Sequence, residues 1–188
     1  MHLILASASP RRAELLTAAG FVYEVAPANV DESVRGTEAP RAYALRLARE
    51  KARKAVASLH HAGSVVLAAD TVVAAQGEIL GKPADRADGA RMLRLLSGGT
   101  HEVHTAVVIL RATAEETEVV TTRVRFVMLS EAEIDWYVAS GEPDGKAGGY
   151  AIQGRGARFI DWIEGSWSNV VGLPIATVYR LLGRVGND

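Results

Sequence analysis

Two adjacent arginines stand where their charge conflicts with the local structure that the sequence favours. Ser9-Pro10 has the pattern of a helix start, which would place Arg11 and Arg12 in the first turn. That end of a helix already carries partial positive charge, so arginines are unfavourable there unless they bind an anion. Guanidinium groups bind phosphate through paired N–H donors, and Ser7 adds a hydroxyl group. The pattern indicates a phosphate site; the alternative is that both arginines point into solvent.

Two lysines are further candidates for binding an anion. Lys51 lies on the alanine- and leucine-rich face of a helix expected over residues 40–56. Its ammonium group must either reach outward to water or find an anion. Lys82 is held in an extended conformation by the following Pro83, but by itself it indicates no function.

Carboxylates that could act with these cations occur at two places. Asp70 follows the apolar run Val65–Ala69, where sheets of α/β proteins present polar groups to a cleft. A buried carboxylate without a partner is costly, so a metal or a cation is expected beside it. The alternative is a structural aspartate that caps a turn. Asp31 and Glu32 form a second pair in a polar loop, which alone is typical of a solvated surface.

A glycine-rich segment over residues 146–154 would let the backbone approach a ligand closely. Within it, the amide of Gln153 can both donate and accept, as reading the edge of a nucleobase requires. A flexible surface loop is the alternative interpretation of the same glycines.

Composition and missing motifs exclude several classes of protein. Lys and Arg total 21 against 22 Asp and Glu, a net charge of −1, so no basic field favours a stable nucleic-acid complex. The absence of cysteine excludes thiolate catalysis and cysteine metal sites. Neither a P-loop, a dinucleotide fingerprint nor a serine-hydrolase elbow occurs. The remaining cations and carboxylates suit a polyphosphate held with a divalent metal.

The elements that must position these residues alternate between strands and helices along a single domain, residues 1–188. Strands are expected at residues 3–6, 21–26, 65–75 with an interruption at Asp70-Thr71, 79–80, 102–110, 118–128 and 157–163. Helices are expected at residues 10–19, 40–56, 88–96, 131–140 and 174–182, with a polar lead-in to the last. With no signal peptide and no apolar run of membrane length, we expect a soluble cytoplasmic protein.

Six blocks of the sequence, taken together and in order, closely resemble the Maf family. They span nearly the whole chain, which makes accidental similarity implausible, although each block is weak alone. The blocks are Leu5-Ala6-Ser7-Ala8-Ser9-Pro10-Arg11-Arg12, Ala69-Asp70-Thr71-Val72-Val73, Ile79-Leu80-Gly81-Lys82-Pro83, Leu96-Ser97-Gly98, Gly148-Gly149-Tyr150-Ala151-Ile152-Gln153-Gly154 and Asn169-Val170-Val171-Gly172-Leu173-Pro174.

The resemblance implies an α/β fold of the inosine-triphosphatase-like kind. Such a fold has an elongated mixed β-sheet flanked by helices, two lobes around a central cleft, and often a homodimer. It implies hydrolysis of nucleoside triphosphates between the α and β phosphates, with Mg²⁺ or Mn²⁺ as the divalent metal cofactor. No membrane partner is implied.

The resemblance also assigns roles by motif position. Asp70 would be the proton acceptor or a metal-linked carboxylate, with Glu32 as a second acidic group at the metal. The polyphosphate would be bound by Ser7, Arg11, Lys51 and Lys82. Base selection would involve Arg12, Thr71 and Gln153.

Within the family, the run Ala69-Asp70-Thr71-Val72-Val73 is similar to the branch that acts on dTTP and UTP. Thr71 therefore favours this branch, with modified pyrimidine triphosphates as further substrates. Two alternatives stay open. One is the branch that hydrolyses methylated guanosine triphosphates, and the other is a nucleotide-binding regulator of septum formation without physiological catalysis.

Overall fold

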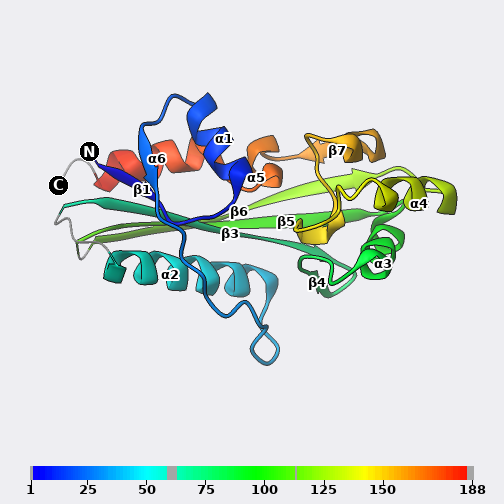
Figure 1. Cartoon of the computed structure of the whole chain (residues 1–188), viewed down its shortest axis with the longest axis horizontal. Coiled ribbons are helices and arrows are strands. Elements are labelled where there is room, and N and C mark those ends of the chain that lie inside the picture. Colours follow the sequence, from blue (N-terminus) through cyan, green and yellow to red (C-terminus); the bar gives the residue numbers. More distant parts are fainter. Residues whose placement is uncertain (1, 59–62, 113, 186–188) are drawn as a thin grey trace. The chain divides into compact units, whose positions relative to one another are not determined.

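The computed structural model describes residues 2–58, 63–112 and 114–185, and shows a mixed α/β fold built on a seven-stranded sheet (Figure 1). The strand order is β2-β1-β3-β5-β6-β7, with β4 paired to β3. The strands are β1 (Leu3–Leu5), β2 (Tyr23–Val25), β3 (Val65–Ala75), β4 (Glu78–Leu80), β5 (Thr100–Arg111), β6 (Ala114–Phe126) and β7 (Ile160–Glu164). The helices are α1 (Pro10–Ala18), α2 (Pro40–Ser58), α3 (Arg86–Leu96), α4 (Glu131–Ala139), α5 (Trp167–Val171) and α6 (Ile175–Val185), with 3₁₀ turns η1 (Ala147–Gly149) and η2 (Arg155–Phe159). A mixed sheet with flanking helices confirms the predicted class.

The chain forms two compact units, and β3, β5 and β6 contribute residues to both. Unit 1 consists of Met1–Thr71, Thr105–Val120 and Gly172–Asp188, and unit 2 of Val72–His104 and Thr121–Val171. The organisation as one domain and the cleft between two lobes stay predictions.

In unit 1, the short strand β1 lies between β2 and β3 and is parallel to both. Helices α1 and α6 cover one face of these strands, and α2 covers the other (Figure 1). The apolar core on the α1 and α6 side comes from β1, β3, β5 and the two helices. Its buried members are Leu3, Leu5, Leu16, Val65, Leu67, Ala69, Val107, Ile109, Leu173, Val178, Leu181, Leu182 and Val185.

Local sequence signals set the ends of the elements that carry the site. Pro10 opens α1, where its missing N–H and fixed φ are favourable, and Gly20 follows the helix with a φ of 77°. In unit 2, Gln76 and Gly77 both have positive φ in the turn from β3 to β4, as a tight hairpin requires. Helix α4 begins with a capping box between Ser130 and Glu133, in which each side chain accepts from the backbone N–H of the other residue.

Two expectations about these elements were wrong, and one short helix was not expected. Asp70-Thr71 does not interrupt β3, which runs continuously from Val65 to Ala75. The strand expected from residue 157 starts only at Ile160, because η2 occupies the preceding residues. The polar lead-in to the last helix contains α5, in which the fully buried Asn169 donates through its side-chain amide to the Val103 carbonyl at 3.0 Å and to Thr122 Oγ1 at 3.0 Å.

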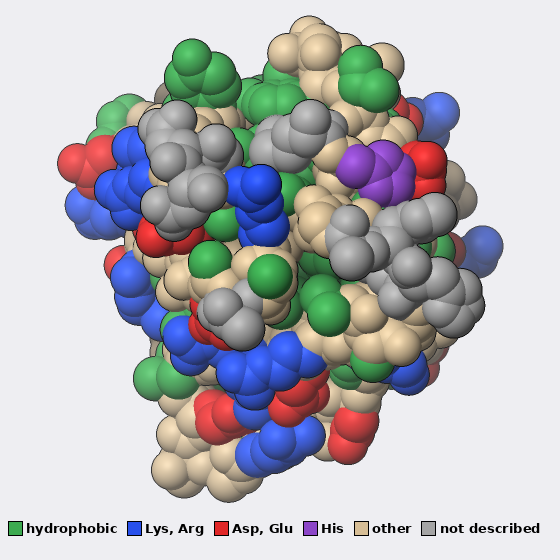
Figure 2. Space-filling model, turned by 90° about the vertical axis from the view of Figure 1, so that its left-hand side faces the viewer, with side chains coloured by type: hydrophobic (Ala, Val, Ile, Leu, Met, Phe, Trp, Pro, Cys, Tyr) green, Lys and Arg blue, Asp and Glu red, His purple; other side chains and the backbone are tan. Residues whose placement is uncertain are grey.

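The surface carries charges of both signs in close pairs. Figure 2 shows Lys and Arg side chains beside Asp and Glu side chains on the face that it presents. Ion pairs among the described residues include Arg180 with Glu118 at 2.7 Å and Arg94 with Glu131 at 2.7 Å. Among the described residues, no helix combines the length and the apolar character that crossing a membrane requires.

His101 on β5 is a buried titratable group of unit 2. Its Nε2 shares a 2.8 Å hydrogen bond with Tyr150 Oη, and its ring meets Phe126 edge-to-face at 5.2 Å. Burial lowers the pKa of His101 from 6.5 to about 4. The imidazole is therefore neutral in the folded protein at neutral pH, whereas in the unfolded chain it gains a proton once the pH falls below its ordinary pKa.

We expect this difference to make folding depend on pH between about 6.5 and 4. Since the folded pKa is the lower one, the contribution to stability is complete above pH 6.5 and declines as the pH falls toward 4. Relative to His101→Phe, the native protein should lose about 2 kcal/mol of unfolding free energy between pH 7.5 and pH 5. Urea denaturation at the two pH values measures this loss, and equal losses in both proteins would contradict the assignment.

Candidate functional site

A buried ion-pair cluster in unit 1 joins three of the predicted site residues. Asp70 comes from β3, Lys51 from α2, and Glu32 from the loop that precedes α2. Lys51 Nζ donates to Asp70 Oδ1 at 2.6 Å and to Glu32 Oε1 at 2.7 Å. Asp70 and Lys51 are buried, whereas the Glu32 side chain is 40% exposed. Lys51 therefore does not reach outward to solvent, and the cation expected beside Asp70 is its ammonium group.

Burial and neighbouring charges have opposite effects on the pKa of Asp70. Burial raises the pKa of this carboxyl above its ordinary value, and the positive charges of Lys51 and Arg12 oppose the rise without cancelling it. A carboxylate with a raised pKa accepts a proton more readily than a solvated one. Asp70 is thus suited to accept a proton, and the charges of Lys51 and Arg12 favour its ionised form.

Arg12 organises a second group of predicted residues. It is buried in the first turn of α1, so the alternative that it points into solvent is wrong. Its Nη1 donates to Ser7 Oγ at 3.0 Å, and its Nη2 donates to Thr71 Oγ1 at 3.1 Å. Its Nε donates to the Gly172 carbonyl at 2.8 Å. One guanidinium group therefore fixes three segments that are far apart in the sequence.

Two residues that sequence analysis did not assign to the site complete this network. Gly172 has a φ of 128°, which favours glycine and lets its carbonyl face Arg12. Thr105 on β5 shares a 2.9 Å hydrogen bond with Thr71 through their hydroxyl groups. The sequence offered a reason to consider Gly172, because this glycine lies in a motif that carries the family resemblance. It offered none for Thr105, which lies in the apolar pattern of a strand.

The loop that carries Glu32 is tied to α2 rather than freely solvated. Tyr43 Oη donates to the Glu32 carbonyl at 2.6 Å. Arg46 donates through Nε to Glu38 Oε1 at 2.7 Å and through Nη2 to the Ser33 carbonyl at 3.0 Å. These contacts fix the backbone at Glu32 and directly after it, which supports the position of its carboxylate beside Lys51.

Three predicted site residues remain, and they are Arg11, Lys82 and Gln153. Arg11 is half-buried and adjacent to Arg12 in the chain; burial lowers the pKa of Arg12, and the positive charge of Arg11 lowers it further. Lys82 is an exposed residue after β4, and Gln153 is exposed in a turn after η1; both belong to unit 2. Their placement beside the unit 1 residues stays a prediction.

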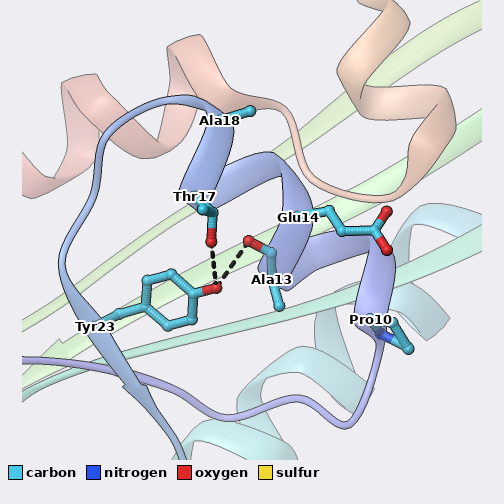
Figure 3. A pocket seen from close by; sticks show the side chains of 6 residues that line it. All are labelled: Pro10, Ala13, Glu14, Thr17, Ala18 and Tyr23. Atoms are coloured by element: carbon cyan, nitrogen blue, oxygen red, sulfur yellow. Dashed lines mark hydrogen bonds between the residues drawn. The ribbon is translucent and has the colours of Figure 1, made fainter.

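A surface hollow on α1 is lined by other residues than those of the predicted site. It is lined by Pro10, Ala13, Glu14, Thr17, Ala18 and Tyr23 (Figure 3). Tyr23 Oη closes one side of it by donating to the Ala13 carbonyl at 2.8 Å, and it shares a 2.9 Å hydrogen bond with Thr17. Its largely apolar lining contains none of the predicted site residues.

The sequence of this chain is similar to those of a known protein family. A family model described as Maf-like protein matches residues 2–185. A protein of an Anaeromyxobacter species named dTTP/UTP pyrophosphatase is 55% identical, covering 99% of this chain and 90% of its own. One of the same name from Koribacter versatilis is 52% identical, covering 99% and 95%. A crystal structure of a nucleoside-triphosphatase, a dITP/XTP pyrophosphatase, from Mycobacterium abscessus aligns with a TM-score of 0.38 and 18% identity over 69% of this chain and 76% of its own.

The Lys51–Asp70 pair leads to a test of stability. Lys51→Met would leave the buried Asp70 carboxylate without its closest cation, and such changes destabilise proteins by about 3 kcal/mol. Lys54→Met on the same helix is the matched control, because Lys54 is exposed and its ammonium group donates to the backbone carbonyl of Asn29 rather than to a buried carboxylate. Its expected loss is within about 0.5 kcal/mol. Urea denaturation compares the two variants, and similar losses would contradict a special role for Lys51.

Proposed function

The chain belongs to the Maf-like protein family. We propose that it hydrolyses dTTP and UTP to the nucleoside monophosphate and pyrophosphate (inorganic diphosphate). Its relatives named dTTP/UTP pyrophosphatase are about half identical to it over nearly their whole length. The observation that carries the proposal is the Asp70–Lys51–Glu32 cluster, in which a buried carboxylate of raised pKa lies beside a buried cation. Thr71 in the Arg12 network favours the pyrimidine branch over methylated guanosine triphosphates.

In the proposed reaction, Asp70 orients a water molecule and takes its proton as the water oxygen attacks the α phosphorus. The new bond joins that oxygen to phosphorus, and the bond to the bridging oxygen of the β phosphate breaks. Pyrophosphate leaves with its negative charge balanced by Lys51, Lys82 and Arg11. Ser7 adds a hydroxyl donor to the polyphosphate. The in-line geometry requires positioned cations more than covalent chemistry by the protein.

A divalent metal is also part of the proposal. Glu32 and Asp70 converge on a single ammonium group, at 2.7 Å and 2.6 Å from Nζ, so two carboxylates already face one cation. No group of three or more His, Asp or Glu side chains suited to a metal occurs among the described residues. Magnesium commonly uses one or two carboxylates together with substrate phosphates. Mg²⁺ or Mn²⁺ held by Glu32 and Asp70 would neutralise phosphate charge in the transition state.

Base selection is assigned in the proposal to Arg12, Thr71 and Gln153. The first two form one hydrogen-bonded group, which gives the Thr71 hydroxyl a fixed direction. Gln153 is exposed, so its amide is available to a ligand. Hydroxyl and amide groups discriminate bases by their donor and acceptor pattern.

The cellular setting is also part of the proposal. We propose a cytoplasmic homodimer that binds nucleoside triphosphates and neither nucleic acid nor membrane. The buried base and its cations favour an enzyme over a regulator of septum formation, since binding a nucleotide without hydrolysis needs no placed proton acceptor.

The experiment that tests the function is pyrophosphate release from a panel of nucleoside triphosphates. We expect cleavage of dTTP and UTP at a higher kcat/KM than of purine or methylated guanosine triphosphates. Activity should require Mg²⁺ or Mn²⁺ and be lost on chelation. Preferred cleavage of methylated guanosine triphosphates would move the chain to that branch, and tight nucleotide binding without release would support the regulator.

The proposed role of Asp70 predicts the effect of Asp70→Asn. We expect kcat to fall about a thousand-fold, because the amide cannot accept the proton of water while its size is unchanged. Asp31→Asn is the control, since this exposed carboxylate lies next to Glu32 in the chain and does not contact Lys51 among the described residues. Circular dichroism checks that both variants are folded. Full activity of folded Asp70→Asn would remove Asp70 from the role of base.

A further inference from the structure

The turn that carries Gln153 is held on both sides by two side chains of unit 2. Tyr137 on α4 accepts at Oη from the Ala151 N–H at 3.0 Å and donates to Glu142 Oε1 at 2.8 Å. Glu142 accepts in turn from the Gly156 N–H through Oε1 at 3.0 Å and from the Arg155 N–H through Oε2 at 2.9 Å. We call Tyr137 and Glu142 the clamp. It binds the backbone two residues before Gln153 and two and three residues after it.

The glycines of the turn are what allow the clamp to come so close. A Cβ atom on Gly154 would lie 2.5 Å from Glu142 Oε1, and one on Gly156 would lie 2.8 Å from Tyr137 Oη. Both distances are well inside van der Waals contact. The Gly154 and Gly156 positions thus fit the carboxylate and the phenol closely, and this explains part of the glycine-rich pattern without invoking flexibility.

The two clamp residues are themselves held in place, Tyr137 by burial and Glu142 by hydrogen bonds to its carboxylate. The Tyr137 side chain is fully buried and meets Phe159 edge-to-face at 5.2 Å. Burial alone would raise the pKa of Glu142, but the N–H groups of Arg155 and Gly156 and the Tyr137 hydroxyl lower it below its ordinary value. A half-buried carboxylate that accepts three hydrogen bonds is ionised at neutral pH, and charge-assisted bonds of this kind are stronger than neutral ones.

By contrast, Gln153 is exposed, and neither clamp residue has a bond to its side chain among the described contacts. A glutamine has three rotatable side-chain bonds, so its amide discriminates between bases only if the backbone beneath it is fixed. We propose that Glu142 and Tyr137 are positioning residues that set the nucleobase selectivity of this enzyme by fixing the turn that carries Gln153. This inference rests on the proposed function, and in particular on the assignment of Gln153 to base selection.

The experiment compares Glu142→Gln, Tyr137→Phe and Gln153→Ala in the full chain. Glu142→Gln keeps the size of the side chain but replaces one acceptor oxygen with a donor, and Tyr137→Phe removes only the hydroxyl. Glu142→Asp keeps the charge and is the conservative variant for rescue. Asp144→Asn is the matched control, because Asp144 is an exposed residue of the same loop whose described hydrogen bonds, to the Gly141 carbonyl and from Lys146, involve only its backbone. Thermal melts select the variants that fold.

The readout is the ratio of kcat/KM for dTTP over dATP, with kcat and KM determined separately. We expect Gln153→Ala, Glu142→Gln and Tyr137→Phe each to lower the ratio about 10-fold, mainly through a higher KM for dTTP, with kcat changed less than about 3-fold. Glu142→Asp should restore part of the ratio, and Asp144→Asn should leave it unchanged. Combining Glu142→Gln with Gln153→Ala should lower the ratio no further than Gln153→Ala alone, because both act through one amide.

The outcomes separate the inference from the function on which it rests. If Gln153→Ala lowers the ratio while folded Glu142→Gln and Tyr137→Phe keep that of the native chain, the inference is wrong and the proposed function stands. Additive losses in the double variant, or an equal loss of kcat on every nucleotide, would also overturn it, because the clamp would then act elsewhere. An unchanged ratio in Gln153→Ala removes the assignment of Gln153 and the inference with it. No hydrolysis of any nucleotide by the native chain refutes the proposed function itself.

Discussion

The buried contact between Lys51 and Asp70 is the constraint on which the arrangement of unit 1 depends. A carboxylate in the interior of a strand is unstable unless a cation neutralises it, and here the cation must come from a helix on the face of the sheet. The face of α2 that is buried carries small side chains at Ala44, Ala48 and Ala52. Small side chains let a helix pack close to a sheet, and this places the ammonium group of Lys51 within hydrogen-bond distance of the Asp70 carboxylate. The same ammonium then draws in Glu32 from the preceding loop.

A second principle of the site is that one cation can hold several segments. Arg12 binds a hydroxyl from the loop after β1, a hydroxyl from β3 and a carbonyl before α6, all from within the first turn of α1. A guanidinium group has a rigid fork of donors, so these partners fix its orientation before any ligand arrives. Donors fixed in advance cost no reorganisation when charge develops in a reaction. An arginine at the positive end of a helix is unfavourable by itself. Here three oxygen acceptors, in Ser7, Thr71 and Gly172, compensate for that cost.

In unit 2 a negatively charged side chain, rather than a positively charged one, holds distant segments together. Its clamp is a carboxylate and a phenol that collect backbone N–H groups of a glycine-rich turn. Side chains thus hold the backbone in both units, and the residues assigned to base selection stand on segments fixed by partners distant in the sequence. Glycine appears in both places for a steric reason. At Gly172 it permits the backbone conformation, and at Gly154 it leaves space for a carboxylate.

The sequence alone determined the order and type of most elements, because proline starts, capping residues and the period of apolar residues act over a few neighbours. It also determined which charged residues were out of place, since Arg12, Lys51 and Asp70 each break a local rule. The partner of each was decided only by tertiary structure. That Lys51 meets Asp70, that Arg12 meets Thr71, and that Thr105 and Glu142 support the network and the turn depends on contacts between residues distant in the chain. Such contacts leave no local period, so a single sequence does not reveal them. The helix over Trp167–Val171 was missed for the same reason, since the hydrogen bonds of the buried Asn169 to Val103 and Thr122 lie outside its own segment.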